Sequence, residues 1–357
     1  ASIGYLASLI GFNYYMQENS SWDISYDFRP GIADSVAKYY EIANRFAFWN
    51  QEKNDFEIHD TEFEIIGYLV IYYLYNVQTI GVDELLYWSE LGFNLADKHG
   101  RVDDKMVFSL TVGIPLALII PDRALPFLLH SYDYLKGNEE ASKEFGVEGG
   151  LYLRYYLYMA YNSLGDLDKT LHYLKDGVQF ADNKGSELPI ANFMRGALAV
   201  FDDRKTDAMI YYSKVIESVD LNDPSENWLY GQAMTEKIGL QIIDGKIDKA
   251  NEDAFSLLEI SEKRNIPTEK INALTMILVI AIAKENYDVA NMALDELLNW
   301  YDNQPKISES YDKEIFDNWL VYYDMSIIIK LIRDEFEDAA KMLEISKNRS
   351  LKEKFNV

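Results

Sequence analysis

The chain has 357 residues, of which 48% are hydrophobic and 14% aromatic, enough to bury a large core. Its 59 acidic residues against 34 basic ones give a formal charge of −25, which repels a phosphate backbone and argues against nucleic acid as a direct partner. It contains no cysteine, so disulfides, thiolate metal sites and cysteine nucleophiles are excluded.

Three segments follow one another along the chain. We predict an N-terminal helical cap over residues 1–61, an array of repeats over 62–350, and a C-terminal tail or the start of a connecting helix over 351–357. No stretch reaches the roughly 20 apolar residues that a membrane span requires, so we predict no span within this chain. Since a chain without cysteine suits an oxidising compartment, we favour an extracytoplasmic location over a cytoplasmic one.

The chain repeats two short helical patterns at the same separation. "FNLADKHGRVDD" at 93–104 and "VQFADNKGSELP" at 178–189 both contain Ala-Asp-x-x-Gly, a typical helix ending, 85 residues apart. "LEISEKRN" at 258–265 and "LEISKNRS" at 343–350 are also 85 residues apart. Self-similarity of this kind predicts a repeat architecture.

A turn pattern marks where two antiparallel helices join. It has a Gly, Asn or Asp, an apolar residue, a polar pair and then a small residue, as in "LGDLDKT" at 164–170 and "DGKIDKA" at 244–250. A small side chain at the last position lets two helices approach closely. The predicted crossing residues, one for each helical hairpin, are Leu85, Ala124, Thr170, Ala208, Ala250, Ala290 and Ala339.

The best-formed unit, "YNSLGDLDKTLHYLKDG" at 161–177, resembles a tetratricopeptide repeat (TPR), and about residues 62–350 resemble the divergent repeats of bacterial regulators and sensors. The resemblance implies an all-α fold, a right-handed α-solenoid of about seven TPR-like hairpins whose inner face is lined by the first helix of each hairpin. Tyrosine-rich runs such as "LYLRYYLYMAYN" would suit strands by propensity, but strand alternation is not sustained.

No pattern of catalytic or cofactor-binding residues is present. The four histidines are widely spaced, without a zinc signature, and there is neither a Gly-x-Ser-x-Gly elbow nor a phosphate-binding loop. "GVEGG" at 146–150 is interpreted as the loop before a helix. We therefore predict no catalytic residues, no metal and no cofactor, and a protein that is not an enzyme.

The register implied by the resemblance predicts which first-helix residues line the inner groove. Two arginines near this face, Arg154 and Arg195, would either clamp a ligand carboxylate or form salt bridges within the protein. A face of hydroxyls, amides and rings suits a peptide, a protein or a small polar ligand. Its tyrosines either recognise that partner or fill the space between helices. The predicted binding residues are Tyr152, Tyr155, Met159, Asn162, Phe193, Arg195, Thr235, Asn272 and Thr275.

These expectations favour a noncatalytic module that binds a ligand or protein, forming the sensory region of a bacterial signalling protein. A cytoplasmic peptide-responsive regulator that binds other proteins and a passive assembly scaffold are the alternatives. The basic stretch from Lys341 to Lys354 either complements the dipole of the last helix or begins a connecting helix. The sequence leaves the oligomeric state open.

Overall fold

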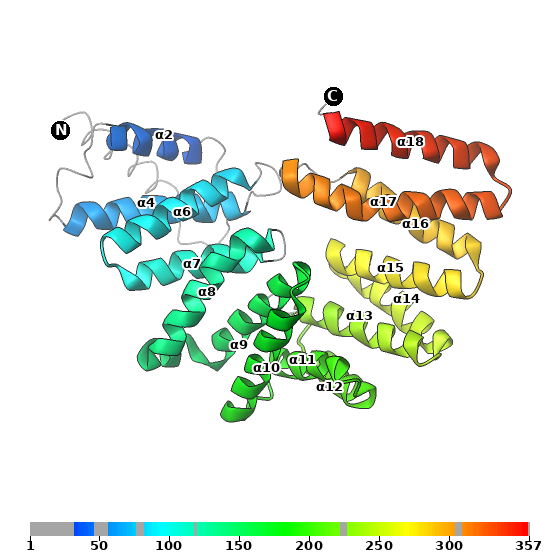
Figure 1. Ribbon diagram of the computed structural model, residues 1–357, viewed down its shortest axis with the longest axis horizontal. Coiled ribbons are helices and arrows are strands. Elements are labelled where there is room, and N and C mark those ends of the chain that lie inside the picture. The colour runs from blue at the N-terminus through cyan, green and yellow to red at the C-terminus, as the bar shows by residue number, and fades with distance from the viewer. Residues whose placement is uncertain are drawn as a thin grey trace. The chain divides into compact units, whose positions relative to one another are not determined.

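A computed structural model describes residues 32–45, 56–75, 82–117, 120–221, 227–303 and 309–355 (Figure 1). Over these residues the chain forms fifteen α-helices and no strand. It divides into two compact units, one formed by the residues up to Glu139 and the other by those that follow, apart from Pro305–Glu309. None of the described helices is both long enough and apolar enough to cross a membrane.

The first unit contains five described helices. Helix α4 packs on α6, α6 on α7 and α7 on α8, so α4–α6 and α7–α8 form two helical hairpins. Helix α2 adds Tyr40, whose ring lies 5.4 Å from that of the buried Trp88 in α6. Of the predicted cap, α2 and the start of α4 are described, and the remainder lies outside the described residues. The helices are α2 (Ile32–Arg45), α4 (Phe56–Tyr75), α6 (Asp83–Lys98), α7 (Val102–Leu116) and α8 (Pro121–Gly137).

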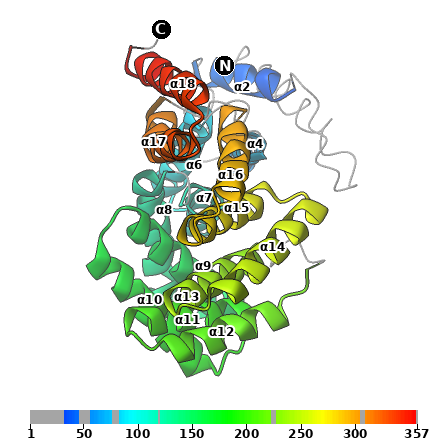
Figure 2. The ribbon, with the colours of Figure 1, turned by 90° about the vertical axis from the view of Figure 1, so that its right-hand side faces the viewer.

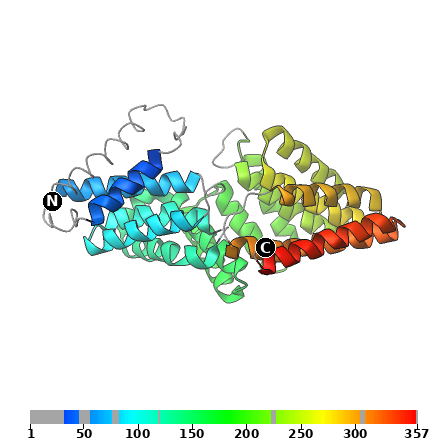
Figure 3. The same cartoon turned by 90° about the horizontal axis from the view of Figure 1, so that it is seen from above.

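The second unit contains five hairpins in chain order. The paired helices α11–α12, α13–α14 and α15–α16 lie side by side, and Figures 2 and 3 show these pairs from two further directions. Their contact surfaces merge into one hydrophobic core that runs from α9 to α17. The helices are α9 (Glu139–Ser163), α10 (Leu167–Lys184), α11 (Pro189–Phe201), α12 (Lys205–Ser218), α13 (Asn227–Ile243), α14 (Ile247–Arg264), α15 (Pro267–Ala283), α16 (Tyr287–Asp302), α17 (Glu309–Ile332) and α18 (Phe336–Phe355).

The predicted crossing residues all lie where the hairpins require them. Each one is in the first turn of the second helix of its hairpin, and each side chain is at most 3% exposed. Close approach of two helices leaves no room for a large side chain at such a point, which explains why five of the seven are alanine. The prediction of seven helical hairpins is confirmed.

The turns of the second unit share one backbone geometry. In every turn that leads into a second helix, the residue five places before the crossing residue has a positive φ, between 55° and 72°. At Gly245, for example, the following N–H, that of Lys246, donates to the carbonyl of Gln241 at 2.8 Å and closes α13. This is the left-handed helix ending that glycine favours, although aspartate and glutamate adopt it in three of the five turns.

The repeated Ala-Asp-x-x-Gly pattern ends two helices in the same way. Gly100 and Gly185 have φ of 66° and 62°, and the residue after each donates its N–H to the carbonyl of Ala96 or Ala181 at 2.9 Å. The two copies of the second repeated pattern, "LEISEKRN" and "LEISKNRS", differ in structure. The first copy ends α14 at the left-handed Asn265, whereas α18 continues past the second copy.

The predicted loop "GVEGG" is only partly a loop. Gly146 has φ 78° and ψ 173° and interrupts α9, but residues 147–150 are helical. A β-carbon at Gly150 would lie 2.9 Å from the ring of Phe180 in α10. Glycine is therefore needed at this position for close helix packing and not for a flexible loop.

Candidate functional site

Three successive first helices bring aromatic rings together. The ring of Tyr155 in α9 lies 5.7 Å from that of Phe193 in α11 and 5.4 Å from that of Trp228 in α13. Tyr158 is 6.1 Å from Tyr155, and Tyr152 is 6.3 Å from Trp228. We call these five residues the aromatic cluster. It forms on helices that the repeat pattern assigned to the inner face.

The cluster has a buried layer and a more accessible one. Tyr155 and Phe193 are 1% and 3% exposed, whereas Tyr152, Tyr158 and Trp228 are half-buried. Burial also raises the pKa of Tyr155 well above its ordinary value, so its hydroxyl stays neutral. The structure thus places two of the predicted binding residues, Tyr155 and Phe193, in the core. Their rings fill the space between α9, α11 and α13 and pack beneath the half-buried rings of the cluster.

The other predicted residues of α9 and α13 are more accessible. Met159 is half-buried against the same core, and Asn162 is exposed at the end of α9. Thr235 is half-buried, and its hydroxyl donates to the carbonyl of Gly231 at 2.8 Å. That bond satisfies the threonine hydroxyl within its own helix.

The two predicted residues of α15 belong to a different neighbourhood. Asn272 and Thr275 are half-buried, and the Thr275 hydroxyl lies 3.4 Å from that of Tyr322 in α17. Tyr322 in turn packs its ring 4.7 Å from that of Trp319. Of the predicted residues, Tyr152, Tyr155 and Phe193 thus belong to the aromatic cluster, whereas Thr275 lies at the contact of α15 with α17.

Both arginines are held by carboxylates of the protein. Arg154 donates from Nε to Asp176 at 2.6 Å, and its guanidinium lies 4.1 Å from the Phe180 ring centroid. Arg195 donates from Nε and Nη2 to one oxygen of Asp182, at 3.1 and 2.8 Å. This arrangement matches the salt-bridge interpretation, because the guanidinium groups that would clamp a ligand carboxylate are engaged inside the protein.

Glu236 of α13 is the residue that the sequence analysis missed. Its side chain is exposed, yet enough protein surrounds it for desolvation to raise the pKa of its carboxyl. Its charge in turn helps raise the pKa of Tyr158 to about 12, an effect due first to burial of the tyrosine. Among the described residues Glu236 forms no ion pair and no hydrogen bond. The only signal in the sequence was that Glu236 directly follows Thr235, a predicted binding residue. Carboxylates are too frequent in this chain for such a position to distinguish one of them.

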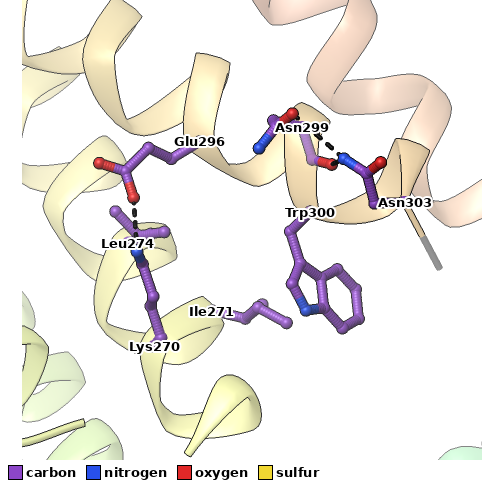
Figure 4. Close-up of a pocket in the computed structure, with 7 residues that line it drawn as sticks. All are labelled: Lys270, Ile271, Leu274, Glu296, Asn299, Trp300 and Asn303. Atoms are coloured by element: carbon purple, nitrogen blue, oxygen red, sulfur yellow. Dashed lines mark hydrogen bonds and ion pairs between the residues drawn. The ribbon is translucent and has the colours of Figure 1, made fainter. Parts of the chain in front are cut away.

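A pocket of about 250 Å³ lies between α15 and α16 (Figure 4). Its rim is internally paired: Lys270 contacts Glu296 at 2.8 Å, and the Asn303 amide donates to the carbonyl of Asn299 at 2.7 Å. Its floor is apolar, formed by Ile271, Leu274 and Trp300. Because its charges neutralise one another, this pocket has a less distinctive chemistry than the surface beside Glu236.

The first unit holds a second pocket of about 250 Å³ between α2, α4 and α6. Here the hydroxyl of Tyr40 donates to the buried carboxylate of Glu62 at 3.0 Å. Within the described part of the chain, no three His, Asp or Glu residues are grouped in a way that could hold a metal ion. The pocket is lined by Tyr40, Asn44, Glu62, Leu91, Asn94, Leu95, Lys98 and His99.

No protein-family model and no curated protein matches the sequence. Among solved structures, the fold is similar to aspartyl phosphate phosphatase F from Bacillus subtilis, with a TM-score of 0.56 and 11% sequence identity over 97% of this chain and 93% of that chain. At this identity the likeness concerns the fold alone. The chain therefore has a TPR-like helical-repeat fold of the α-solenoid class, as predicted.

Two further solved structures are similar at lower scores. One is a Rap protein complexed with competence and sporulation factor, with a TM-score of 0.45 and 12% identity over 98% of this chain and 99% of that chain. The other is a signal-transduction ATPase with a tetratricopeptide-repeat sensor from Pyrococcus horikoshii, with a TM-score of 0.44 and 13% identity. The match covers 97% of this chain and 62% of the ATPase.

Proposed function

We propose that the chain is a noncatalytic helical-repeat module that binds a peptide or another protein, and that it is the sensory region of a bacterial signalling protein. The observation that carries the proposal is the accessible layer of the aromatic cluster, where Tyr152 and Tyr158 of α9 and Trp228 of α13 lie half-buried around the ring of Tyr155. Tyrosine and tryptophan supply large contact areas at a small entropic cost and are enriched where proteins bind partners.

Stacked hairpins are suited to holding an extended chain. Each repeat contributes one first helix, so residues at matching positions form a continuous surface longer than any single helix provides. A peptide laid across α9, α11 and α13 would meet rings, the Met159 thioether and one carboxylate in succession. We propose an extracytoplasmic location for this surface. A cytoplasmic peptide-responsive regulator and a passive scaffold remain the alternatives.

The binding proposal is tested with a synthetic library of random heptapeptides passed over the immobilised protein. We expect retained peptides, and we expect Tyr158→Ala to lower retention about tenfold, as for a central aromatic contact. Tyr211→Ala, a half-buried tyrosine on the second helix α12, is the matched control and should retain peptides like the unchanged protein. If the unchanged protein retains none, the scaffold alternative is favoured. Equal losses in both variants would place the site elsewhere.

The noncatalytic part of the proposal has its own test. The similar Bacillus subtilis protein is named for a phosphatase activity on aspartyl phosphate. We expect this chain to leave acetyl phosphate, a small acyl phosphate of the same chemical class, hydrolysing at the rate found in buffer. Release of phosphate that increases in proportion to protein concentration would contradict the proposal.

A further inference from the structure

We infer that the carboxyl-terminal ends of four successive first helices, α11, α13, α15 and α17, form a second binding surface, which binds a basic amphipathic helix of another protein. This surface shares no residue with the aromatic cluster, so the inference goes beyond the proposed function. It consists of apolar side chains that are between 37% and 65% exposed and lie within the last five residues of their helices. We call these residues the apolar strip: Val200, Phe201, Ile243, Val279, Ile282, Ile328, Leu331 and Ile332.

The four helices lie next to one another in chain order and in one register. Helix α11 contacts α13, and α13 contacts α15, where a β-carbon at Gly231 would lie 2.5 Å from Cγ of Glu269. The Thr275 hydroxyl of α15 lies 3.4 Å from the hydroxyl of Tyr322 in α17. In both of these contacts the residue on the later helix is two places further from its crossing residue than the residue on the earlier helix. The carboxyl-terminal ends of the helices therefore follow one another along one edge of the second unit.

The fold does not require apolar residues at this edge. Each strip residue leaves more than a third of its surface exposed, so it contributes less to the core than a buried side chain would. The second helices α10, α12, α14 and α16 end differently, each in a polar or charged residue: Lys184, Ser218, Arg264 and Asp302. Contiguous exposed apolar residues are typical of a surface that a partner covers.

The spacing of the apolar strip favours a helix over an extended peptide. Helices that pack together lie about 8–10 Å apart, so strip residues recur at about this distance from one first helix to the next. Residues seven positions apart on a helix are about 10.5 Å apart, whereas side chains on one face of an extended chain recur about every 6.6–6.8 Å. On α15 and α17 the strip is two side chains wide, because Val279 and Ile282, like Ile328 and Leu331, are one turn apart. The two apolar rows of an amphipathic helix match this width.

The charges on these four helices favour a basic partner. Their described basic side chains are all paired with carboxylates of the protein: Arg195 with Asp182 at 2.8 Å, Lys237 with Asp253 at 3.3 Å, Lys270 with Glu296 at 2.8 Å and Lys330 with Asp295 at 3.8 Å. The exposed carboxylates of Glu236 and Asp324 form no described ion pair. Together with the formal charge of −25, this excess of carboxylates attracts lysine and arginine beside the apolar face of the partner helix.

The test measures the binding of three labelled peptides to the full chain by fluorescence anisotropy. Each peptide spans three heptads, about 32 Å as a helix, close to the extent of a row across four packed helices. The first has leucine at the first and fourth heptad positions and lysine and alanine elsewhere. The second has the same composition in an order without an apolar face, and the third replaces every lysine with glutamate.

The strip variant combines Val279→Gln with Ile328→Gln. Its matched control combines Ile210→Gln with Met292→Gln, at residues of α12 and α16 that are 52% and 40% exposed. We expect the unchanged protein and the control to bind the first peptide about tenfold more tightly than the other two, and the strip variant to bind it about tenfold more weakly. Tyr158→Ala should keep the preference, because Tyr158 belongs to the aromatic cluster. Circular dichroism checks that each variant keeps its helical fold.

Several outcomes would overturn the inference. Equal binding of the first two peptides would show attraction by charge alone, and equal binding of the first and third would show that a basic partner is not preferred. An unchanged affinity in the strip variant, or a loss only in Tyr158→Ala, would place the site elsewhere. A dimer in sedimentation equilibrium that the strip variant converts to a monomer would identify a second copy of the chain as the occupant. If random heptapeptides are retained while the first peptide is not bound, the proposed function stands and this inference fails.

Discussion

The crossing positions and the surface beside the aromatic cluster belong to the same hairpins but follow opposite rules. At the crossings, seven side chains are almost fully buried, and their size is fixed by the distance between two helices. In the accessible layer of the cluster, Tyr158 and Trp228 are half-buried, and Glu236 of the same helix α13 as Trp228 is exposed without a described partner. The first region contains what the fold requires. The second contains groups that the fold does not require, which is why we assign binding to it.

The largest effect should come from the buried ring of the aromatic cluster. Tyr155→Ala removes a fully buried ring that contacts Phe193 and Trp228, and we expect a loss of about 3–5 kcal/mol in the free energy of unfolding. Tyr158→Ala, in the half-buried layer, should lower the free energy of unfolding by clearly less. Urea unfolding followed by circular dichroism measures both. Equal losses would remove the distinction between the buried and the accessible layer.

The next effect concerns a crossing position. Ala290→Phe places a large ring where α15 and α16 meet, at a residue with no exposed surface, and overpacking should cost about 1–3 kcal/mol. Met292→Phe is the control, since Met292 is 40% exposed on the same helix and its replacement should change stability by less than about 0.5 kcal/mol. If Ala290→Phe is as stable as the control, the crossings are looser than the structure shows.

The sequence predicted the hairpins well because their signals are local. A turn residue, an apolar residue and a small crossing residue lie within one short segment, and each has a steric reason to occur there. Glu285 and Asp334 show the limit, since they adopt the left-handed conformation without being glycine. Helix interiors such as residues 147–150 were harder, because the need for glycine at Gly150 comes from Phe180 on another helix.

A third prediction compares two glycines of neighbouring elements. Gly245 has φ 72° in the turn after α13, so Gly245→Ala should destabilise the protein by about 1–2 kcal/mol. Gly239 lies inside α13, where an added β-carbon would meet no atom within 4 Å, so Gly239→Ala should stabilise it by about 0.5–1 kcal/mol. Thermal unfolding should show melting temperatures displaced in opposite directions. Changes of the same sign would contradict the assignment of one glycine to a turn and the other to a helix.

The binding residues were harder to predict than the hairpins. Tyr155 and Tyr158 are both tyrosines of one helix, and whether each lies in the core or at the surface depends on a helical register that α11 and α13 determine. The pattern placed Tyr155 and Phe193 on the inner face, and the structure places them beneath it. Glu236 could not be distinguished among 59 acidic residues, because the desolvation that raises the pKa of its carboxyl depends on the folded protein around it.

The smallest effect tests whether Glu236 costs stability in the free protein. Its folded-state pKa is raised above the ordinary value of 4.5 by desolvation, so the folded protein binds that proton more tightly than the unfolded chain does. The proton on Glu236 therefore makes a favourable contribution to the free energy of unfolding below pH 4.5. This contribution is lost as the pH rises from there through the raised folded-state pKa. We expect Glu236→Gln to be the more stable protein at pH 7, with an advantage that shrinks toward pH 4, as urea midpoints across this range will show. Glu217→Gln removes one negative charge elsewhere on the acidic surface, and if it produces the same pH-dependent gain, the effect reflects the net charge of the chain and not the surroundings of Glu236.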